Sequence, residues 1–435
     1  MRRPLGREMS DLAWWLILAA VGLSATALVV HVHARLGTAS APFVGRYRLK
    51  VDPGTVLAPA VAVAVLIASV RRLPDRLPWP GLLAAAYAAA LAWTLSLAVV
   101  DGGNGLASPV TNPGEYFADV DAVAGRPAEF LRTFVADGTQ HAIATRQHPP
   151  GPVLLLWSLT RAGVTRPAEI GLLITIVGTL TVPTVLVALR SLCGEASARR
   201  LAPILVLAPY AVWVAVSMDA VTATLCAAMV TAGVLASEHR RRGPAALSWA
   251  GVSGLLLGVG ALFSYATPWL AFSVVCVYFV RRRPLLNVVT GAAALVPLAL
   301  AQSAGFGWAA GLTAAQADFS LRVEPQRSAV VWGLVSLVVL GLACGPAVVS
   351  SARKIRRTPG WPFLVGAVAA VGFAVTAGLA RGEMEHAWLP YFPWLLVAAI
   401  APERRGGEPA PTPHWLIGAG ALGAVILEAV LHTAW

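Results

Sequence analysis

The polar loop from Asp101 to Pro152 carries the titratable side chains best suited to chemistry at a membrane surface. Its carboxylates Glu115, Asp119 and Asp121 lie within one short stretch. A carboxylate in such a place can act as general base toward an acceptor hydroxyl, with a pKa tuned by its burial. A single loop carboxylate is more often simply solvated. The three together favour a catalytic role. The leading hypothesis makes Asp119 or Asp121 the base with Glu115 behind it, and the sequence leaves the final choice among the three open.

The same loop closes on His148-Pro149-Pro150-Gly151-Pro152, a sequence that stops a helix and forces extended or turn backbone. Two interpretations are equally supported. The segment is a rigid connector with an incidental histidine, or it holds His148 at the lip of a cleft where the imidazole binds phosphate. Tyr116, next to Glu115, is a further candidate for substrate contact.

Asp219 forms a second candidate position, in a turn where two apolar stretches meet. An ionisable residue at or near membrane depth is costly and is a functional candidate by default. Ser217 or Asp219 would also suit the start of the following helix as a cap. The two roles are compatible, and Asp219 is expected to contact substrate.

A third cluster runs from Arg381 to Trp394 and contains Glu383, Glu385 and His386. Anchoring at the membrane interface explains Arg381 and the tryptophans, but it does not explain two carboxylates and an imidazole together. An Arg and a His here could hold an anionic phosphate while a Glu orients them. These four charged or titratable residues are therefore expected to bind substrate.

Metal and disulfide chemistry are not indicated. The chain has no His-x-x-x-His and no cysteine pair at ligand spacing, so no zinc site is predicted. Its four cysteines lie in or beside apolar runs and suggest no disulfide framework.

The elements that position these residues are membrane helices. The 435 residues are 57% hydrophobic and 12% charged, and apolar runs of about 20 residues recur throughout, which predicts an all-α polytopic membrane protein. No polar stretch is long enough for a soluble domain, so residues 1–435 form a single transmembrane domain. About 13 spans are expected, near 12–32, 55–70, 81–100, 168–190, 201–218, 220–238, 247–265, 268–280, 285–303, 328–350, 361–380, 387–401 and 415–434.

The net charge of +12 comes from short basic clusters between the spans, which is the positive-inside pattern and not a nucleic-acid surface. With a cytoplasmic N-terminus, the inner segments hold 21 of the 33 Lys and Arg residues. They lie at 2–7, 71–76, 190–200, 240–242, 281–283, 353–357 and 404–405. This assignment makes 403–413 a cytoplasmic linker and places 34–54, 101–167, 304–327 and the C-terminus outside.

Residues 152–162 are apolar but only about 11 long, or roughly 16 Å as a helix, which is too short to cross. The next run, 168–190, must begin outside to end at the inner Arg190. The segment is therefore predicted to dip in and return, or to lie at the interface, where irregular backbone is tolerated against a wet cavity. We expect 101–167 to be an outer catalytic-loop region.

In type and order these clusters resemble the GT-C class of integral-membrane glycosyltransferases. Family members have an acidic residue in an outer loop, a His-Pro-Pro-type segment and a second acid in a later turn. The matches here are Glu115, Asp119 or Asp121, then His148 to Gly151, then Asp219. Gly382 to Trp388 resembles a Gly-Glu-x-x-Arg-x-Trp motif of actinobacterial members, with His386 in place of Arg. Two spans, 55–70 and 81–100, precede the acidic loop here, whereas the family places that loop directly after its first span.

The resemblance implies transfer of a hexose or pentose from a polyprenyl-phosphate carrier to a glycan or lipid acceptor hydroxyl. The reaction would take place at the outer face of the plasma (inner) membrane, in the cell envelope. It requires no cofactor, and a divalent cation (Mg2+, Mn2+ or Ca2+) is left open. The alternative function is a multi-span transporter or flippase for a lipid-linked or anionic substrate, which would use a buried acid and a broken helix. A non-catalytic scaffold would not need the acidic loop.

Overall fold

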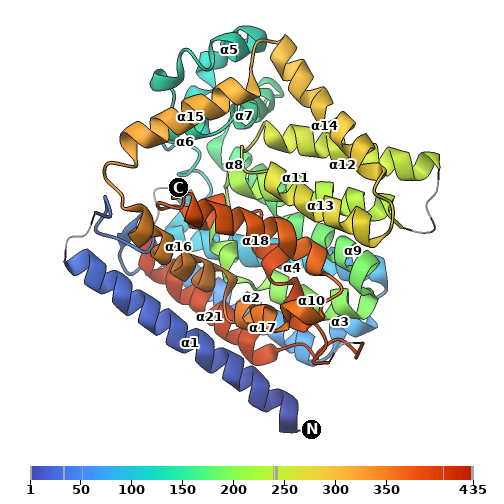
Figure 1. Cartoon of the computed structure of the whole chain (residues 1–435). Coiled ribbons are helices and arrows are strands. Elements are labelled where there is room, and N and C mark those ends of the chain that lie inside the picture. The colour runs from blue at the N-terminus through green and yellow to red at the C-terminus, as the bar shows by residue number, and fades with distance from the viewer. Residues whose placement is uncertain are drawn as a thin grey trace.

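The computed structural model describes residues 2–32, 35–50, 52–238, 240, 243–404 and 406–432. Arg241, Arg242 and Arg405 of the predicted basic clusters lie outside these described residues, as do parts of the predicted outer loop 34–54 and last span. The described chain is almost entirely helical, with one two-stranded ladder (Figure 1). The prediction of an all-α polytopic membrane protein is confirmed.

Seven helical segments within the described chain are long and apolar enough to cross a membrane, and a bent pair would make eight. The segments are α1 (Arg2–His31), η1 (Pro53–Val56) with α2 (Leu57–Val70), α4 (Trp79–Ala98), α8 (Pro167–Thr179) with α9 (Thr181–Cys193), α11 (Met218–Ala236), α12 (Pro244–Ala261) and α14 (Leu286–Ser303). The bent pair is α16 (Ala329–Cys344) and α17 (Ala347–Lys354), and α17 continues into η7 (Ile355–Arg357). The chain bends by 104° at the break between α16 and α17. Three shorter apolar helices are α13 (Pro268–Val280), α18 (Trp361–Thr376) and α21 (His414–Val430).

Two of the predicted spans, 201–218 and 387–401, are broken into short pieces. The first contains the second half of α10 (Glu195–Val206) and then η6 (Pro209–Trp213); the second contains α20 (Phe392–Leu395) and η8 (Val397–Ile400). Both are buried against other helices, where irregular backbone is tolerated. Side chains of α17 satisfy part of the freed backbone, because Lys354 Nζ donates to the Ala399 carbonyl at 2.8 Å and Ser351 donates to the Leu395 carbonyl. Prolines in both segments interrupt the helical ladder.

Segments predicted to lie on the inner side contact one another, and so do segments predicted to lie on the outer side. At one end, Arg353 pairs with Asp11 at 2.8 Å, and Arg7 pairs with Glu403 at 2.6 Å. At the other end, β1 (Arg46–Tyr47) and β2 (Leu431–His432) pair antiparallel, which brings the predicted first outer loop to the end of α21. The molecule therefore has a basic end and an opposite end that carries the long loops.

The long loops fold into a cap of short helices at the top of Figure 1. It consists of α5 (Pro127–Thr133), α6 (Ile143–Gln147), α7 (Gly151–Arg161), α15 (Trp308–Arg322) and the turns η3 (Tyr116–Asp119), η4 (Asp121–Val123) and η5 (Gly138–Gln140). The turn η2 (Val99–Asn104) precedes the cap and packs on α4 and η1. α7 has 11 residues and packs on η3 and η4. It is thus part of the cap, in agreement with the prediction that 152–162 does not cross. The remaining short helices are α3 (Leu73–Arg76) and α19 (Met384–Ala387).

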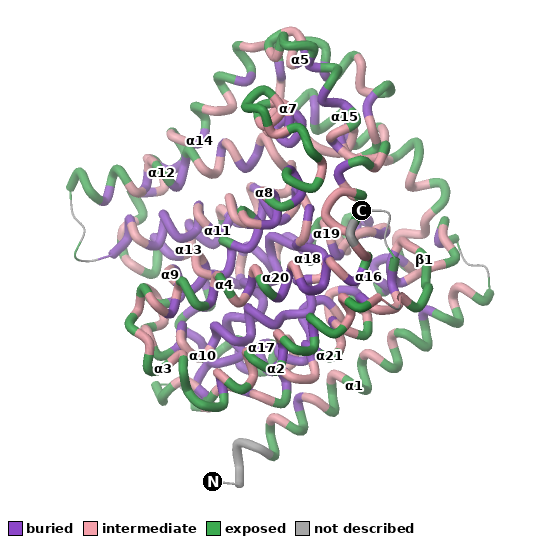
Figure 2. Tube along the Cα trace, turned by 180° about the vertical axis from the view of Figure 1, so that it is seen from behind, coloured by how far each residue is buried: buried purple, intermediate pink, exposed green. Residues whose placement is uncertain are grey.

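Burial is concentrated along the middle of the bundle, around α10, α11 and α20, while the outer helices are exposed (Figure 2). The exposed side chains of α1 and α14 are largely apolar, as at Trp14, Val288 and Leu295, each more than half exposed. Apolar surface on this scale indicates contact with lipid. A second, smaller core lies inside the cap and includes Phe130, Phe134 and Phe306.

Candidate active site

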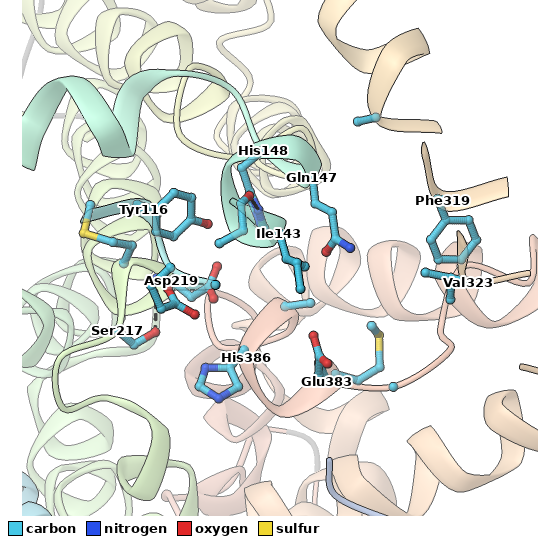
Figure 3. Close-up of a pocket in the computed structure, with 18 of the residues that line it drawn as sticks. Tyr116, Ile143, Gln147, His148, Ser217, Asp219, Phe319, Val323, Glu383 and His386 are labelled. Atoms are coloured by element: carbon cyan, nitrogen blue, oxygen red, sulfur yellow. Dashed lines mark hydrogen bonds between the residues drawn. The ribbon is translucent and has the colours of Figure 1, made fainter. Parts of the chain in front are cut away.

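A cavity of about 330 Å³ lies between the cap and the helical bundle (Figure 3). Its walls come from six stretches that are distant in sequence: the loop before η3, helix α6, the turn before α11, the turn between α12 and α13, α15 with the loop after it, and the segment between α18 and α20. Its polar or titratable lining residues are Glu115, Tyr116, Gln147, His148, Ser217, Asp219, Tyr265, Gln316, Arg327, Arg381, Glu383 and His386.

Glu115 reaches the cavity from a short turn. The Gly114 amide donates to Asn112 Oδ1 at 2.8 Å, and the Gly114 carbonyl accepts from the Ala144 amide at 3.0 Å, which ties the turn to α6. The pKa of Glu115 is raised to about 7, chiefly by burial and also by the nearby carboxylates Asp219 and Glu383. Glu115 therefore changes its charge near neutral pH.

His148 ends α6 and lines the cavity. Its Nδ1 donates to the Ala144 carbonyl at 3.0 Å, which orients the ring, and the Tyr116 ring meets it edge-on at 5.7 Å. The following Gly151 donates its amide to the Leu262 carbonyl at 2.9 Å. A Cβ at position 151 would lie 2.3 Å from that oxygen, so only glycine allows the contact. The His-Pro-Pro-Gly segment is thus both a connector to α12 and the holder of a cavity histidine.

Asp219 lies in the first turn of α11, and Ser217 caps that helix by accepting the Asp219 amide at 3.2 Å. Figure 3 shows the Asp219 side chain close to Ser217 in the cavity. The preceding Val216 has a φ of 59°, unusual for a β-branched residue, and its amide is held by Thr175 Oγ1 at 3.0 Å. Strain of this kind, about 1–3 kcal/mol, is concentrated at functional sites.

Arg381 lines the cavity, but its guanidinium is already engaged. It forms an ion pair with Glu324 at 3.1 Å, and it donates to the carbonyls of Gly378 at 2.6 Å and Arg327 at 3.0 Å. These bonds join the end of α18 to the loop after α15. Arg381 therefore acts first as a structural clamp at the cavity rim.

Arg327 was not among the residues predicted from the sequence. Its Nη1 donates to the Arg381 carbonyl at 2.7 Å, and its guanidinium carbon lies 5.5 Å from the centre of the Trp332 ring. Among the described residues it forms no ion pair with a carboxylate. The backbone beside it is unusual, with φ of 110° at Gly382 and 59° at Glu383. A Cβ at position 382 would lie 2.6 Å from Arg327 Nη1, so the glycine makes room for the guanidinium.

Glu383 and His386 also line the cavity (Figure 3). Burial raises the pKa of Glu383, Arg327 and His148 lower it, and Asp219 raises it. Burial lowers the pKa of His386 below its usual value, although Asp219 opposes the shift, so this imidazole is neutral at pH 7. A neutral imidazole is a weaker phosphate ligand than a guanidinium.

Three of the predicted residues lie elsewhere. Glu385 is fully buried and does not line the cavity; burial raises its pKa to about 8. Asp119 also lies outside the lining, where its Oδ2 accepts from the Ala142 amide at 2.9 Å and its Oδ1 is 3.6 Å from His141 Nδ1. Burial alone would raise the pKa of Asp119, but His141, Thr145 and the Ala142 amide lower it overall. Asp121 is exposed at the start of η4.

The described residues contain no set of three or more His, Cys, Asp or Glu side chains arranged to hold a metal ion. Glu115, Asp219 and Glu383 share the cavity without forming such a ligand set.

Three solved structures are similar to this chain in part. ArnT from Cupriavidus metallidurans in the apo state superposes with a TM-score of 0.42 at 18% identity, over 63% of this chain and 53% of that one. The same protein bound to undecaprenyl phosphate gives 0.45 at 16% identity, over 71% and 58%. The Archaeoglobus fulgidus oligosaccharyltransferase in complex with Zn and sulfate gives 0.34 at 14% identity, over 58% and 40%. The chain thus matches little more than half the length of ArnT, and at these scores the similarity supports no statement about its function.

No protein-family model and no curated protein sequence matches the chain.

Proposed function

We propose that this protein is a membrane glycosyltransferase of the GT-C type, which moves a hexose or pentose from a polyprenyl-phosphate carrier to an acceptor hydroxyl. The observation that carries the proposal is the cavity. Glu115, Asp219 and Glu383, from three separate segments, line it together with Arg327, a guanidinium that has no carboxylate ion-pair partner in the described chain. The cavity lies at the end of the apolar helical bundle that carries the long loops. A one-step displacement at a sugar carbon needs a base for the acceptor and a cation for the leaving phosphate.

The acceptor oxygen attacks the anomeric carbon, the bond from that carbon to the phosphate oxygen breaks, and the acceptor proton passes to a carboxylate. One-step attack would invert the anomeric configuration. Glu115 is our choice of base, because it lines the cavity and its pKa of about 7 suits proton transfer at neutral pH. Asp119 and Asp121 are the alternatives from the sequence, and the variants below decide among the three.

The leaving polyprenyl phosphate gains negative charge as the bond breaks, and Arg327 is the group we assign to it. Its side chain retains donors beyond the one given to the Arg381 carbonyl. His148, with Nδ1 committed to a carbonyl, can offer Nε2 when protonated. Arg381 keeps the wall in place through Glu324, while Tyr116, Asp219, Glu383 and His386 are assigned to the sugar hydroxyls. We assign Glu385, which is buried within the 383–387 segment, a supporting structural role.

The lipid tail of the donor needs an apolar path from the cavity into the bilayer. The α15 face supplies Leu312, Phe319 and Val323 to the lining, and Leu379 adds to it from the opposite segment. These residues suit the first isoprene units of a polyprenyl chain. We place the cavity at the outer face of the plasma membrane, because the opposite end of the molecule carries Arg7, Arg353 and the other basic clusters.

The test is transfer from synthetic polyprenyl-phosphate sugars by the purified protein in liposomes, with release of polyprenyl phosphate as the readout. Glu115→Gln should reduce transfer by about 100-fold or more, and Asp119→Asn and Asp121→Asn should keep most of it. Glu129→Gln is the matched control, since Glu129 is a surface carboxylate on α5 paired with Arg126. Full activity in Glu115→Gln would exclude Glu115 as the base, and failure with every donor sugar would reject the function.

A further inference from the structure

The charges around the cavity do not balance. Glu115, Asp219 and Glu383 line it, and none of the three forms an ion pair among the described residues. Of the two lining guanidiniums, Arg381 is paired with Glu324. Arg327 is therefore the one lining guanidinium in the described chain that is left to compensate three carboxyl groups.

Among the carboxyl groups that line the cavity, Arg327 acts on Glu383 in particular; it also lowers the pKa of the buried Glu385. The positive charge of Arg327 lowers the pKa of Glu383, whereas Glu115 responds chiefly to burial, Asp219 and Glu383. The link is also geometric. Arg327 Nη1 donates to the carbonyl of Arg381, two residues before Glu383, and Gly382 between them leaves room for the guanidinium. Glu383 thus depends on Arg327 for the stability of its negative charge.

The other groups around Glu383 give little further compensation. Asp219 on α11 raises the pKa of Glu383 and so opposes its ionisation. Glu115 before η3 is also acidic, and Glu383 raises its pKa in turn. Glu385 on α19 is buried, with a pKa of about 8, and is mostly neutral at pH 7. His386 on the same short helix is neutral, and His148 at the end of α6 is the second group that favours the carboxylate. Arg327 and His148 are also the two groups assigned above to the phosphate.

We propose that the cavity binds an anionic phosphodiester together with a proton, and that Glu383 is the group that takes the proton up. The inference rests on the proposed function, since it uses the same cavity and the same phosphate contact. When a phosphate occupies Arg327, the guanidinium no longer compensates Glu383, and a second negative charge is brought close to it. The proton comes from solvent and converts the Glu383 carboxylate to the neutral acid.

The sign of the effect follows from linkage. A ligand whose binding raises the pKa of a carboxyl group binds more tightly as the pH falls, by up to about tenfold per pH unit for one proton. Binding should therefore weaken as the pH rises above the pKa of Glu383 in the free protein. At low pH, where Glu383 is already protonated, the dependence should disappear.

The probe is farnesyl methyl phosphodiester, whose single negative charge does not titrate in the working range. Calorimetric titration of the full-length protein in two buffers of different ionisation enthalpy gives the number of protons taken up. We expect a net uptake of protons at pH 7.5 that disappears at low pH, where Glu383 is already protonated. Binding without any buffer dependence would overturn the inference and leave the proposed function standing. No binding at all in the wild type would count against the proposed function itself.

Two variants of the same segment identify the group. Glu383→Gln should take up no proton, and at pH 8 it should bind the phosphodiester several-fold more tightly than the wild type, because no carboxylate competes for Arg327. Glu385→Gln replaces a buried acid that is mostly neutral at pH 7 by a neutral amide, and this variant should keep the proton uptake of the wild type. Unchanged proton uptake in Glu383→Gln would assign the proton to another group and refute the proposal, and the wild-type measurement holds even if a variant does not fold.

Discussion

Replacement of Gly382 by alanine tests whether the geometry around Arg327 serves the reaction. Gly382 has a φ of 110°, and a Cβ there would lie 2.6 Å from Arg327 Nη1. The backbone strain should cost about 1–3 kcal/mol. The displaced guanidinium would also lose its bond to the Arg381 carbonyl, now 2.7 Å long. A hydrogen bond from a charged group contributes about 1.5–3 kcal/mol.

These contributions together predict a loss of unfolding free energy of about 2.5–6 kcal/mol. Donor recognition should suffer as well. If Arg327 holds the phosphate, its displacement should raise the KM for the polyprenyl-phosphate donor by about 10-fold or more, equivalent to the loss of one charged contact. The KM for the acceptor should change little, because the acceptor hydroxyl faces Glu115.

Gly125→Ala is the matched control. Gly125 lies in the cap with a φ of 71°, and a Cβ there would meet nothing within 4 Å. The Gly125→Ala substitution therefore lowers the unfolding free energy by about 1–2 kcal/mol through its positive φ, with no steric collision and away from the cavity. The assay combines thermal unfolding in detergent with transfer kinetics at varied donor. If Gly382→Ala matches Gly125→Ala in both stability and donor KM, the role given to Arg327 is refuted.

Four further outcomes are expected. If Glu115 is the base, kcat/KM should fall as the pH drops below about 7, because the raised pKa leaves it protonated there, and a flat profile from pH 6 to 8 would contradict this assignment. Arg381→Gln should lower the melting temperature through loss of the Glu324 pair, which Glu324→Gln should reproduce; a loss of donor affinity without any loss of stability would argue against a clamp. Treatment with EDTA should leave the transfer rate within about twofold, and a loss restored by Mg2+, Mn2+ or Ca2+ would show that a metal is needed. Reporter fusions should place residue 130 and the C-terminus outside and residue 240 inside, and a cytoplasmic residue 130 would reverse the orientation.

Much of the architecture could be predicted because its signals are local. Apolar runs predict helices in lipid, and the Lys and Arg clusters separate the loops into two sets that the structure finds at opposite ends. The length of 152–162 alone showed that it does not cross, and α7 has 11 residues. The breaks in 201–218 and 387–401 were missed, since hydropathy does not distinguish an apolar helix from apolar irregular backbone buried inside the protein.

The candidate site divides in a similar way. Residue type and membrane position pointed to Glu115, Asp119, Asp121, His148, Asp219 and the 381–386 segment. Of these, Glu115, His148, Asp219, Arg381, Glu383 and His386 line one cavity, whereas Asp119, Asp121 and Glu385 do not. Arg327 carried no signal in the sequence, because it is one of several arginines in outer segments. Its importance comes from Gly382, which leaves room for the guanidinium, and from the pairing of Arg381 with Glu324.

The sequence by itself determined that this is a polytopic helical protein whose charged and titratable side chains are concentrated in the loops, with the candidate site residues in the loops of one end, because burial of charge in lipid is costly. Only the tertiary structure decided which of those groups share a cavity. Asp119 is turned to the Ala142 amide and Asp121 to solvent, while Glu115 faces Asp219 and Glu383. The physical reason is that contacts between distant segments, such as the Gly151–Leu262 and Arg327–Arg381 hydrogen bonds, set the direction of each side chain.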